Sequence, residues 1–363
     1  MKIGIITQPL RYNYGGILQN YALQEVLRQM GHEVVTLNSK VKAKRTPKRV
    51  IKEFIKWVIL KLRNSKGYVL GVIKFYTSDE ILARNTSIFV KQFIETENIG
   101  KLINPKFDAL IVGSDQVWRP EYSNLDEAFL CFANKWNVKR LAYAASFGID
   151  SVVFSPTECE KYGTQLRRFD AVSVREKSGV HICKTIFNVD AEHVLDPTLL
   201  LTSDDYVEKL GLLNFPKSPG ELFYYFLDNN IEKMAIVKKI SSLLKFLSFT
   251  VNSNVEDLES PIENRIQPPV EKWLRAFYDS SLVITDSFHG CVFSIIFNKP
   301  FLLVINEKRG ESRFLSLFEQ LGIYNRLIEQ NSPIDVSTFM EKPNVNLAEL
   351  RNKSIEFLKK HLT

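Results

Sequence analysis

The sequence lacks the long apolar runs and clustered cysteines that mark membrane-spanning, secreted and metal-binding proteins. No stretch reaches about 18 apolar residues without a charge, and residues 1–16 contain no uninterrupted apolar core of the signal-peptide kind. The four cysteines, Cys131, Cys159, Cys183 and Cys291, have no CxxC or other short metal-binding spacing. We therefore expect a cytoplasmic protein with reduced cysteines in its core, no disulfides, and no metal or other cofactor.

Composition and charge indicate a folded protein of two domains. Hydrophobic residues make up 45% of the 363 residues and charged residues 25%, which excludes a disordered or low-complexity chain. At roughly 150 residues per domain, this length predicts two domains. The net charge is +7, but residues 40–74 hold twelve lysines and arginines against one acid, Glu53. Because the rest of the chain is slightly acidic, we expect no nucleic-acid partner.

Short apolar runs alternate with helical patterns through both halves of the chain. The opening reads as a strand at 2–7, a helix at about 17–30 and a strand at 33–37. A second series begins near residue 222, with helices expected at about 232–246, 270–279 and 312–321. This alternation predicts an α/β protein with two doubly wound, Rossmann-like parallel sheets facing a cleft. We place the first domain at 1–205 with a basic insertion at about 40–100, the second at 206–345, and a last helix at 346–363 that can pack back on the first domain.

Two polar segments follow predicted strands in the first half, where open α/β sheets bind their ligands. YNYGGILQ places two glycines before a helix whose free N–H groups suit an anion, although such a glycine pair is more often only a tight turn. GSDQVW offers polar side chains for sugar hydroxyls with Trp118 as a stacking surface, while Asp115 can instead cap a helix. The candidate cleft residues of these segments are Asn13, Tyr14, Gly15, Gly16, Gln19, Ser114, Asp115, Gln116 and Trp118.

Arginine and histidine side chains supply the candidate chemistry. Arg175 ends the predicted strand DAVSV and can grip a carboxylate or phosphate with two prongs, or simply pair with Glu176. His289 stands where a predicted buried strand changes into an apolar helix, so a rigid element holds an imidazole that exchanges protons near neutral pH. Arg309 and Arg313 follow the next predicted strand and can form an anion clamp.

In their order and spacing, the motifs NYGG, GSDQVW, SVREK, VLDPT, TDSFHG and RGESR resemble the polysaccharide pyruvyl transferase family. The resemblance covers most of the chain, apart from residues 40–99 and the last helix. It implies a fold like that of the two-domain (GT-B) glycosyltransferases, phosphoenolpyruvate as co-substrate, and a sugar of a cell-surface polysaccharide precursor as acceptor. Pyruvate would be transferred to that sugar as a ketal, usually across its 4- and 6-hydroxyls, with release of phosphate.

The resemblance also implies roles for individual residues. His289 falls on the general acid, Arg175 on a donor-binding arginine, and Asp196 on the aspartate of the family's Asp-Pro motif, which we include among the cleft residues. Family members carry arginine two residues before the histidine, where this chain has Ser287. The missing donor contact would then pass to Arg309 or Arg313, and Ser287 and Gly290 are kept as candidate donor-binding residues.

The basic segment reads as an amphipathic helix from Lys48 to Arg63. Its basic residues span an arc of about 100°, and its apolar residues, Trp57 among them, fill the opposite side. Such a helix can pack on the protein's own sheet. It can also lie on anionic lipid at the inner face of the plasma membrane, near an acceptor linked to polyprenyl diphosphate.

Two other functions fit the same residues. A nucleotide-sugar glycosyltransferase shares the architecture but releases a nucleoside diphosphate instead of inorganic phosphate. A non-catalytic homologue that only binds an anionic ligand would keep Arg175 and tolerate the loss of His289.

Overall fold

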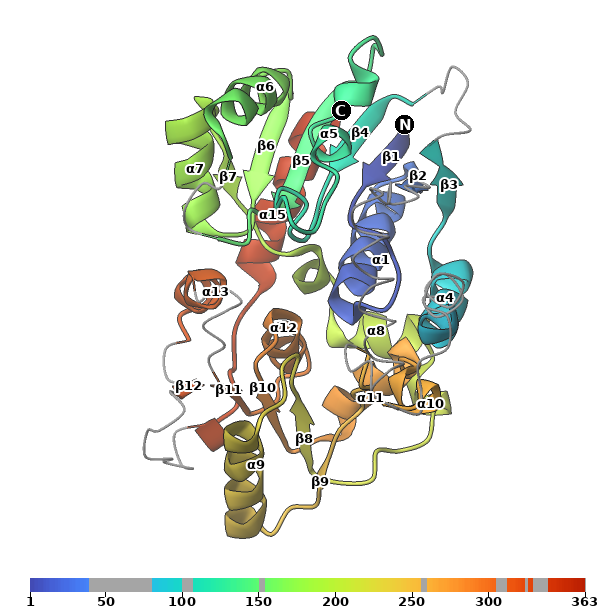
Figure 1. Cartoon of the computed structure of the whole chain (residues 1–363), viewed down its shortest axis with the longest axis vertical. Coiled ribbons are helices and arrows are strands. Elements are labelled where there is room, and N and C mark those ends of the chain that lie inside the picture. The colour runs from blue at the N-terminus through green and yellow to red at the C-terminus, as the bar shows by residue number, and fades with distance from the viewer. Residues whose placement is uncertain are drawn as a thin grey trace, which may run out of the picture.

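The first half of the chain forms a helix-covered parallel sheet (Figure 1). The computed structural model describes residues 1–38, 80–99, 107–149, 154–255, 260–304, 312–323, 326–328 and 339–362. The strands of this sheet are β1 (Lys2–Ile6), β2 (Glu33–Asn38), β3 (Thr96–Asn98), β4 (Ala109–Val112), β5 (Lys139–Ala145), β6 (Ala171–Val174) and β7 (Glu192–His193). Their order is β3-β2-β1-β4-β5-β6-β7, and every neighbouring pair is parallel.

Helices and short helical turns connect these strands. The α-helices are α1 (Tyr14–Gln29), α4 (Arg84–Phe93), α5 (Leu125–Ala128), α6 (Pro156–Leu166), α7 (Lys177–Phe187) and α8 (Ser203–Lys209). The 3₁₀ turns are η2 (Cys131–Ala133), η3 (Pro197–Leu200) and η4 (Leu212–Asn214). Side chains start some of the helices: Ser155 and Glu158 form a capping box at α6, and Thr202 and Asp205 form one at α8.

The second half repeats the pattern on a smaller scale. Its strands are β8 (Leu222–Tyr225), β9 (Ser248–Phe249), β10 (Leu282–Thr285), β11 (Phe301–Val304) and β12 (Leu327–Ile328), in the order β12-β11-β10-β8-β9. Its helices are α9 (Ile231–Leu244), α10 (Ile262–Arg265), α11 (Val270–Asp279), α12 (Phe288–Ile296) and α13 (Ser312–Leu321), and α15 (Ala348–Leu362) follows. All pairings in this sheet are parallel too.

Both sheets reverse their strand order at one point, as doubly wound sheets do. The reversal lies between β1 and β4 in the first sheet and between β8 and β10 in the second. The predicted fold class, two doubly wound parallel sheets, is therefore confirmed. The predicted helix at 17–30 begins three residues early, at Tyr14, so that Gly15 and Gly16 lie inside the first turn of α1.

Aromatic packing joins the two halves. Tyr14 of α1 stacks on Trp273 of α11 with ring centres 5.0 Å apart, and its hydroxyl donates to the Pro268 carbonyl at 2.8 Å. Both aromatic side chains are fully buried. Tyr14 is thus a contact between the two halves of the molecule and does not face the ligand space that the sequence analysis gave it.

The last helix, α15, lies against the first sheet, as Figure 1 shows in red beside β5. Arg351 donates to the carbonyls of Leu199 and Leu201, and the Ser354 hydroxyl accepts the N–H of Leu195 at 3.0 Å. No helix in the described part of the chain has the length and hydropathy of a membrane-spanning segment.

Candidate active site

A cavity of about 920 Å³ opens between the two sheets, at the carboxyl ends of their strands. From the first sheet it is lined by Gln8 after β1 and by Asp115 and Gln116 after β4. From the second it is lined by Asp228 after β8 and by Asp286 after β10. These are the strands beside the two order reversals, which is where doubly wound sheets bind ligands.

His289 lies in the wall of this cavity, in the first turn of α12. Ser287 precedes that helix, and its hydroxyl accepts the Gly290 N–H at 3.4 Å, so Ser287 is a helix cap. A Cβ on Gly290 would lie 2.2 Å from the Thr285 hydroxyl oxygen. Gly290 therefore lets α12 approach β10 closely and carries no side chain to a ligand.

Gly15 of α1 lies directly against the His289 ring. A Cβ at this position would stand 2.0 Å from Nδ1 of His289, closer than any side chain can come. The same addition at Gly16 would meet nothing nearer than the Asn13 side-chain nitrogen at 3.4 Å. Two motifs more than 270 residues apart, NYGG and FHG, thus meet at one imidazole.

The other ring nitrogen of His289 faces Asp196. Nε2 lies 3.7 Å from Oδ2 of Asp196, within ion-pair distance if the ring is protonated. Nε2 is buried and has no hydrogen-bond partner among the residues that the structure describes. Burial would raise the pKa of Asp196, but His289 and the Arg175 guanidinium outweigh it and hold that pKa well below its usual range.

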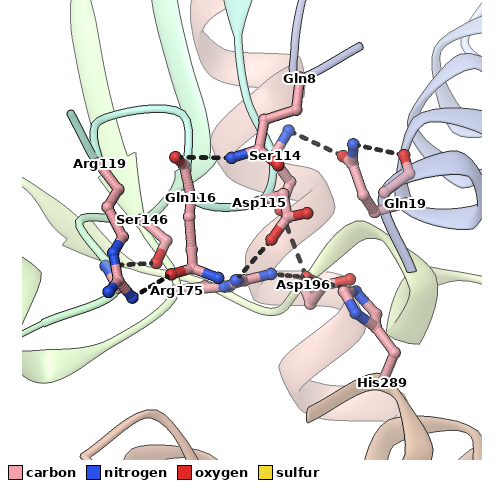
Figure 2. Close-up of polar contacts among 12 residues, drawn as sticks. Gln8, Gln19, Ser114, Asp115, Gln116, Arg119, Ser146, Arg175, Asp196 and His289 are labelled. Atoms are coloured by element: carbon pink, nitrogen blue, oxygen red, sulfur yellow. Dashed lines mark hydrogen bonds and ion pairs between the residues drawn. The ribbon is translucent and has the colours of Figure 1, made fainter. Parts of the chain in front are cut away.

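Arg175 lies beside Asp196 and Asp115 and reaches both carboxylates, as Figure 2 shows. Its terminal nitrogens donate to Asp196 at 2.8 Å and to Asp115 at 3.1 Å, and its Nε lies 3.8 Å from Glu176. The Arg175 side chain is 1% exposed and does not line the cavity. The prediction that Arg175 binds the donor therefore finds no support in this arrangement, in which Arg175 holds two carboxylates in place. Asp115 lines the cavity, whereas Asp196, predicted to be a cleft residue, is buried and does not line it.

The polar residues of the first half divide into buried supports and cavity residues. Gln19 accepts the Ser114 N–H at 2.8 Å and donates to the Gly16 carbonyl, and both Gln19 and Ser114 are fully buried (Figure 2). Asn13, Gly15, Asp115 and Gln116 face the cavity, whereas Tyr14, Gly16, Gln19 and Ser114 do not line it.

Trp118 does not provide the predicted stacking surface. Its ring is fully buried between Phe129 and Phe147, at centre distances of 5.4 and 4.9 Å, and its indole N–H donates to the Ala128 carbonyl. Trp118 is buried because these aromatic rings, one of which follows α5, pack against it in the core. The exposed aromatic residue of this loop is Tyr122, which is 47% exposed and lines the cavity.

A buried ion pair that the sequence analysis missed supports the second half of the site. Nζ of Lys233 lies 2.6 Å from Oδ2 of Asp286, and the same carboxylate accepts the N–H groups of Leu227 and Asp228. These contacts tie the loop after β8 to the start of α12. The sequence feature that indicates this pair is the position of Lys233 on the same face of α9 as the apolar residues Ile236 and Val237, where a lysine needs a charged partner.

Arg313 is the described residue of the RGESR motif that reaches the cavity. It is 6% exposed, and its guanidinium lies 5.8 Å from the ring centre of Phe288, which also contacts Arg175 at 4.6 Å. Burial, and then the nearby charge of Arg175, lower the pKa of Arg313 to about 10. Arg309 and the segment from Lys48 to Arg63 lie outside the described residues. Within the described ranges, no cluster of histidine, cysteine and carboxylate side chains could hold a metal ion.

One of the comparisons with known proteins identifies a family. A family model described as polysaccharide pyruvyl transferase matches residues 13–308. No curated protein sequence matches the chain.

Similar solved structures include the UDP-GlcNAc 2-epimerase of Methanocaldococcus jannaschii in complex with UDP-GlcNAc and UDP, at 12% identity and a TM-score of 0.49, covering 99% of this chain and 100% of that one. UGT89C1 of Arabidopsis thaliana complexed with UDP-L-rhamnose has 10% identity and a TM-score of 0.48, covering 99% and 94%. A glycosyltransferase from Rickettsia africae has 13% identity and a TM-score of 0.46, covering 100% and 98%. These likenesses concern the fold alone.

Proposed function

Because the chain belongs to the polysaccharide pyruvyl transferase family, we propose that it transfers pyruvate from phosphoenolpyruvate to a sugar of a cell-surface polysaccharide precursor. The product is a cyclic ketal on the sugar, and inorganic phosphate is released. The observation that carries this proposal is the cavity wall at His289, where a buried ring nitrogen without a hydrogen-bond partner in the described chain lies 3.7 Å from a carboxylate.

His289 is the proton donor in this proposal. Its imidazolium gives a proton to C3 of phosphoenolpyruvate, which leaves positive charge at C2 for a sugar hydroxyl to attack. The neutral imidazole then takes the proton of that hydroxyl. A second hydroxyl forms a bond to C2 as the C2–O bond to phosphate breaks, and the departing phosphate takes the proton of this second hydroxyl. Asp196 attracts the positive charge of the ring while it is protonated, and Arg175 and Thr198 hold the carboxylate in place.

The donor carries a phosphate and a carboxylate, so its pocket needs cationic groups. Ser287 and Arg313 both line the cavity, and we assign to Arg313 the cationic donor contact that a serine hydroxyl cannot replace. Arg309 remains a further candidate. Asp115, Gln116 and Asn13 line the opposite side of the cavity and are proposed to face the acceptor sugar.

The test is release of phosphate from phosphoenolpyruvate with a panel of lipid-linked and nucleotide-linked sugars, with the ketal detected by mass spectrometry. His289→Gln keeps a hydrogen-bonding side chain but cannot donate the proton, so we expect turnover to fall about 10²–10⁴-fold. His181→Gln is the matched control, because His181 is exposed on α7.

Three outcomes would contradict the proposal. A His289→Gln variant with nearly full activity removes the proton donor. Release of a nucleoside diphosphate from a nucleotide sugar favours a glycosyltransferase. Binding of phosphoenolpyruvate without turnover on any acceptor favours a non-catalytic homologue.

We also propose that the acceptor is linked to polyprenyl diphosphate and that the segment from Lys48 to Arg63, for which the sequence predicts an amphipathic helix, contacts anionic lipid. Each basic residue near such a surface contributes about 1 kcal/mol, so Lys52→Glu with Lys56→Glu should clearly weaken sedimentation with anionic vesicles. Binding should also fall as salt is raised. If vesicles do not change the Trp57 fluorescence and the protein does not sediment with them, a segment packed on the protein and a soluble acceptor are favoured instead.

A further inference from the structure

A second cavity, of about 530 Å³, lies in the first half of the molecule beside the cavity described above. It is formed by the residues after β1, the end of β2, and the loop that leads into α5. The two cavities share four lining residues, Gln8, Tyr12, Asn13 and Tyr122. Because they meet along these residues, one ligand can extend from the first cavity into the second.

The lining of the second cavity suits an uncharged, hydroxyl-rich ligand. Thr7, Asn38, Ser123 and Asn124 bring hydroxyl and amide groups, and an apolar floor includes Leu37. Among the residues that the structure describes, the lining includes the cationic Arg11 and the acidic Glu127. Side-chain hydroxyl and amide groups over an apolar surface are the groups that bind the hydroxyls and C–H face of a sugar, so the described lining fits a sugar unit.

Tyr122 stands where the two cavities meet and offers an exposed aromatic surface. The Arg119 guanidinium lies 4.6 Å from its ring centre, and Arg119 is itself held by Gln116 at 3.0 Å and Glu121 at 3.1 Å. The backbone N–H of Tyr122 donates to the Arg119 carbonyl at 3.1 Å, which closes a turn. A ring that is supported in this way and is still 47% exposed can pack against the C–H face of a sugar at little cost in entropy.

We propose that the second cavity binds the sugar unit next to the one that receives pyruvate, with Tyr122 as the stacking residue. The inference rests on the proposed function. It means that the acceptor is recognised as a disaccharide or longer glycan, and that the first cavity alone holds the donor and the receiving sugar. The enzyme would then act on a repeat unit that other glycosyl transfers have already extended by at least one sugar.

The experiment compares disaccharide and monosaccharide acceptors on the full chain. Lactose, cellobiose and N,N′-diacetylchitobiose are assayed beside the methyl β-glycosides of galactose, glucose and N-acetylglucosamine. The measured quantity is the ratio of kcat/KM for each disaccharide to kcat/KM for its monosaccharide. We expect Tyr122→Ala to lower this ratio about 10-fold, which corresponds to about 1.4 kcal/mol.

Two variants control for side effects of the substitution. Tyr122→Phe keeps the ring and should keep the wild-type ratio. Tyr278→Ala removes a tyrosine of similar setting, 38% exposed with the Arg275 guanidinium 5.4 Å from its ring, which lines neither cavity. This variant should leave the ratio unchanged.

The outcomes separate failure of this inference from failure of the proposed function. Suppose that the wild-type protein forms ketals and that the kcat/KM ratio of Tyr122→Ala lies within about 2-fold of the wild-type ratio. This result overturns the second site and leaves the proposed reaction intact. The panel of lipid-linked and nucleotide-linked sugars decides the proposed reaction. If none of the free sugars receives pyruvate, saturation-transfer NMR with the same disaccharides tests the site. Saturation that Tyr122→Ala loses and Tyr278→Ala keeps supports the site. Equal saturation in all variants, or none in the wild type, overturns it.

Discussion

Gly15→Ala and Gly16→Ala change neighbouring glycines in the first turn of α1 but should have opposite effects. Alanine is favoured over glycine inside a helix by about 0.5–1 kcal/mol, so helix propensity alone would stabilise both variants. The added methyl group of Gly16→Ala meets its nearest atom at 3.4 Å, which is an ordinary contact. We expect this variant to be as stable as the wild type or slightly more stable, with unchanged activity.

The methyl group of Gly15→Ala would lie 2.0 Å from Nδ1, 2.5 Å from Cγ and 2.6 Å from Cε1 of His289. These atoms belong to a rigid ring with neighbours on other sides. Its Nε2 lies 3.7 Å from Oδ2 of Asp196, and its centre lies 5.3 Å from the ring centre of Phe288. To regain an ordinary contact, the ring must move by more than about 1 Å, a displacement that can cost roughly 10²-fold in rate. We expect kcat to fall by about that factor, because the proton donor is misplaced.

Three measurements test this pair of variants. Phosphate release reports activity, and urea denaturation reports the free energy of unfolding. The chain has five histidines, so NMR of histidine-labelled protein can follow the His289 ring directly, with its signal assigned from His289→Gln. The reasoning is refuted if Gly15→Ala keeps the wild-type His289 signal and rate, or if Gly16→Ala loses as much activity as Gly15→Ala.

Four further changes test the surroundings of the site. Asp196 has a lowered pKa, so its carboxylate stabilises the fold above about pH 4 and loses this effect as the pH falls. In urea titrations, Asp196→Asn should therefore lose less unfolding free energy than the wild type between pH 7 and pH 3. Arg175→Lys cannot make both bonds of the arginine fork, so we expect it to lower the unfolding free energy by about 1–3 kcal/mol while calorimetry shows little change in phosphoenolpyruvate affinity. Arg313→Ala should instead weaken phosphoenolpyruvate binding about 10–100-fold in the same calorimetry, and an unchanged affinity would remove it from the donor pocket. Lys233→Met leaves Asp286 buried without its partner and should cost about 3–5 kcal/mol of unfolding free energy.

Several features could be predicted from the sequence because they depend on neighbouring residues. The helices at Val270–Asp279 and Ser312–Leu321 lie where the apolar periodicity places them, since that periodicity is local. The alternation of strands and helices predicted two doubly wound sheets, because parallel strands need helical crossovers. The position of His289 between a buried strand and an apolar helix could be read from residues 282–297 alone.

Local patterns predicted the position of Arg175 at a strand end but not its partners. The sequence predicts an anion-binding site at the arginine after β6, because Glu176 is the acidic residue near it in sequence that could pair with its charge. Folding brings Asp115, 60 residues away, and Asp196, 21 residues away, against the same guanidinium. Arg175 is therefore occupied by carboxylates that the sequence does not place beside it.

The same limit applies to Trp118 and to the two glycines. Trp118 and Tyr122 share one polar loop, and only the packing of Phe129 and Phe147 decides that the tryptophan is buried while the tyrosine is exposed. Gly15 and Gly16 are identical in sequence terms, yet one touches the His289 ring and the other does not. Local chemistry thus determined the elements and the strand ends at which a site could form, whereas contacts between residues distant in sequence decided which side chains line that site, because burial and charge pairing depend on neighbours that only the tertiary fold supplies.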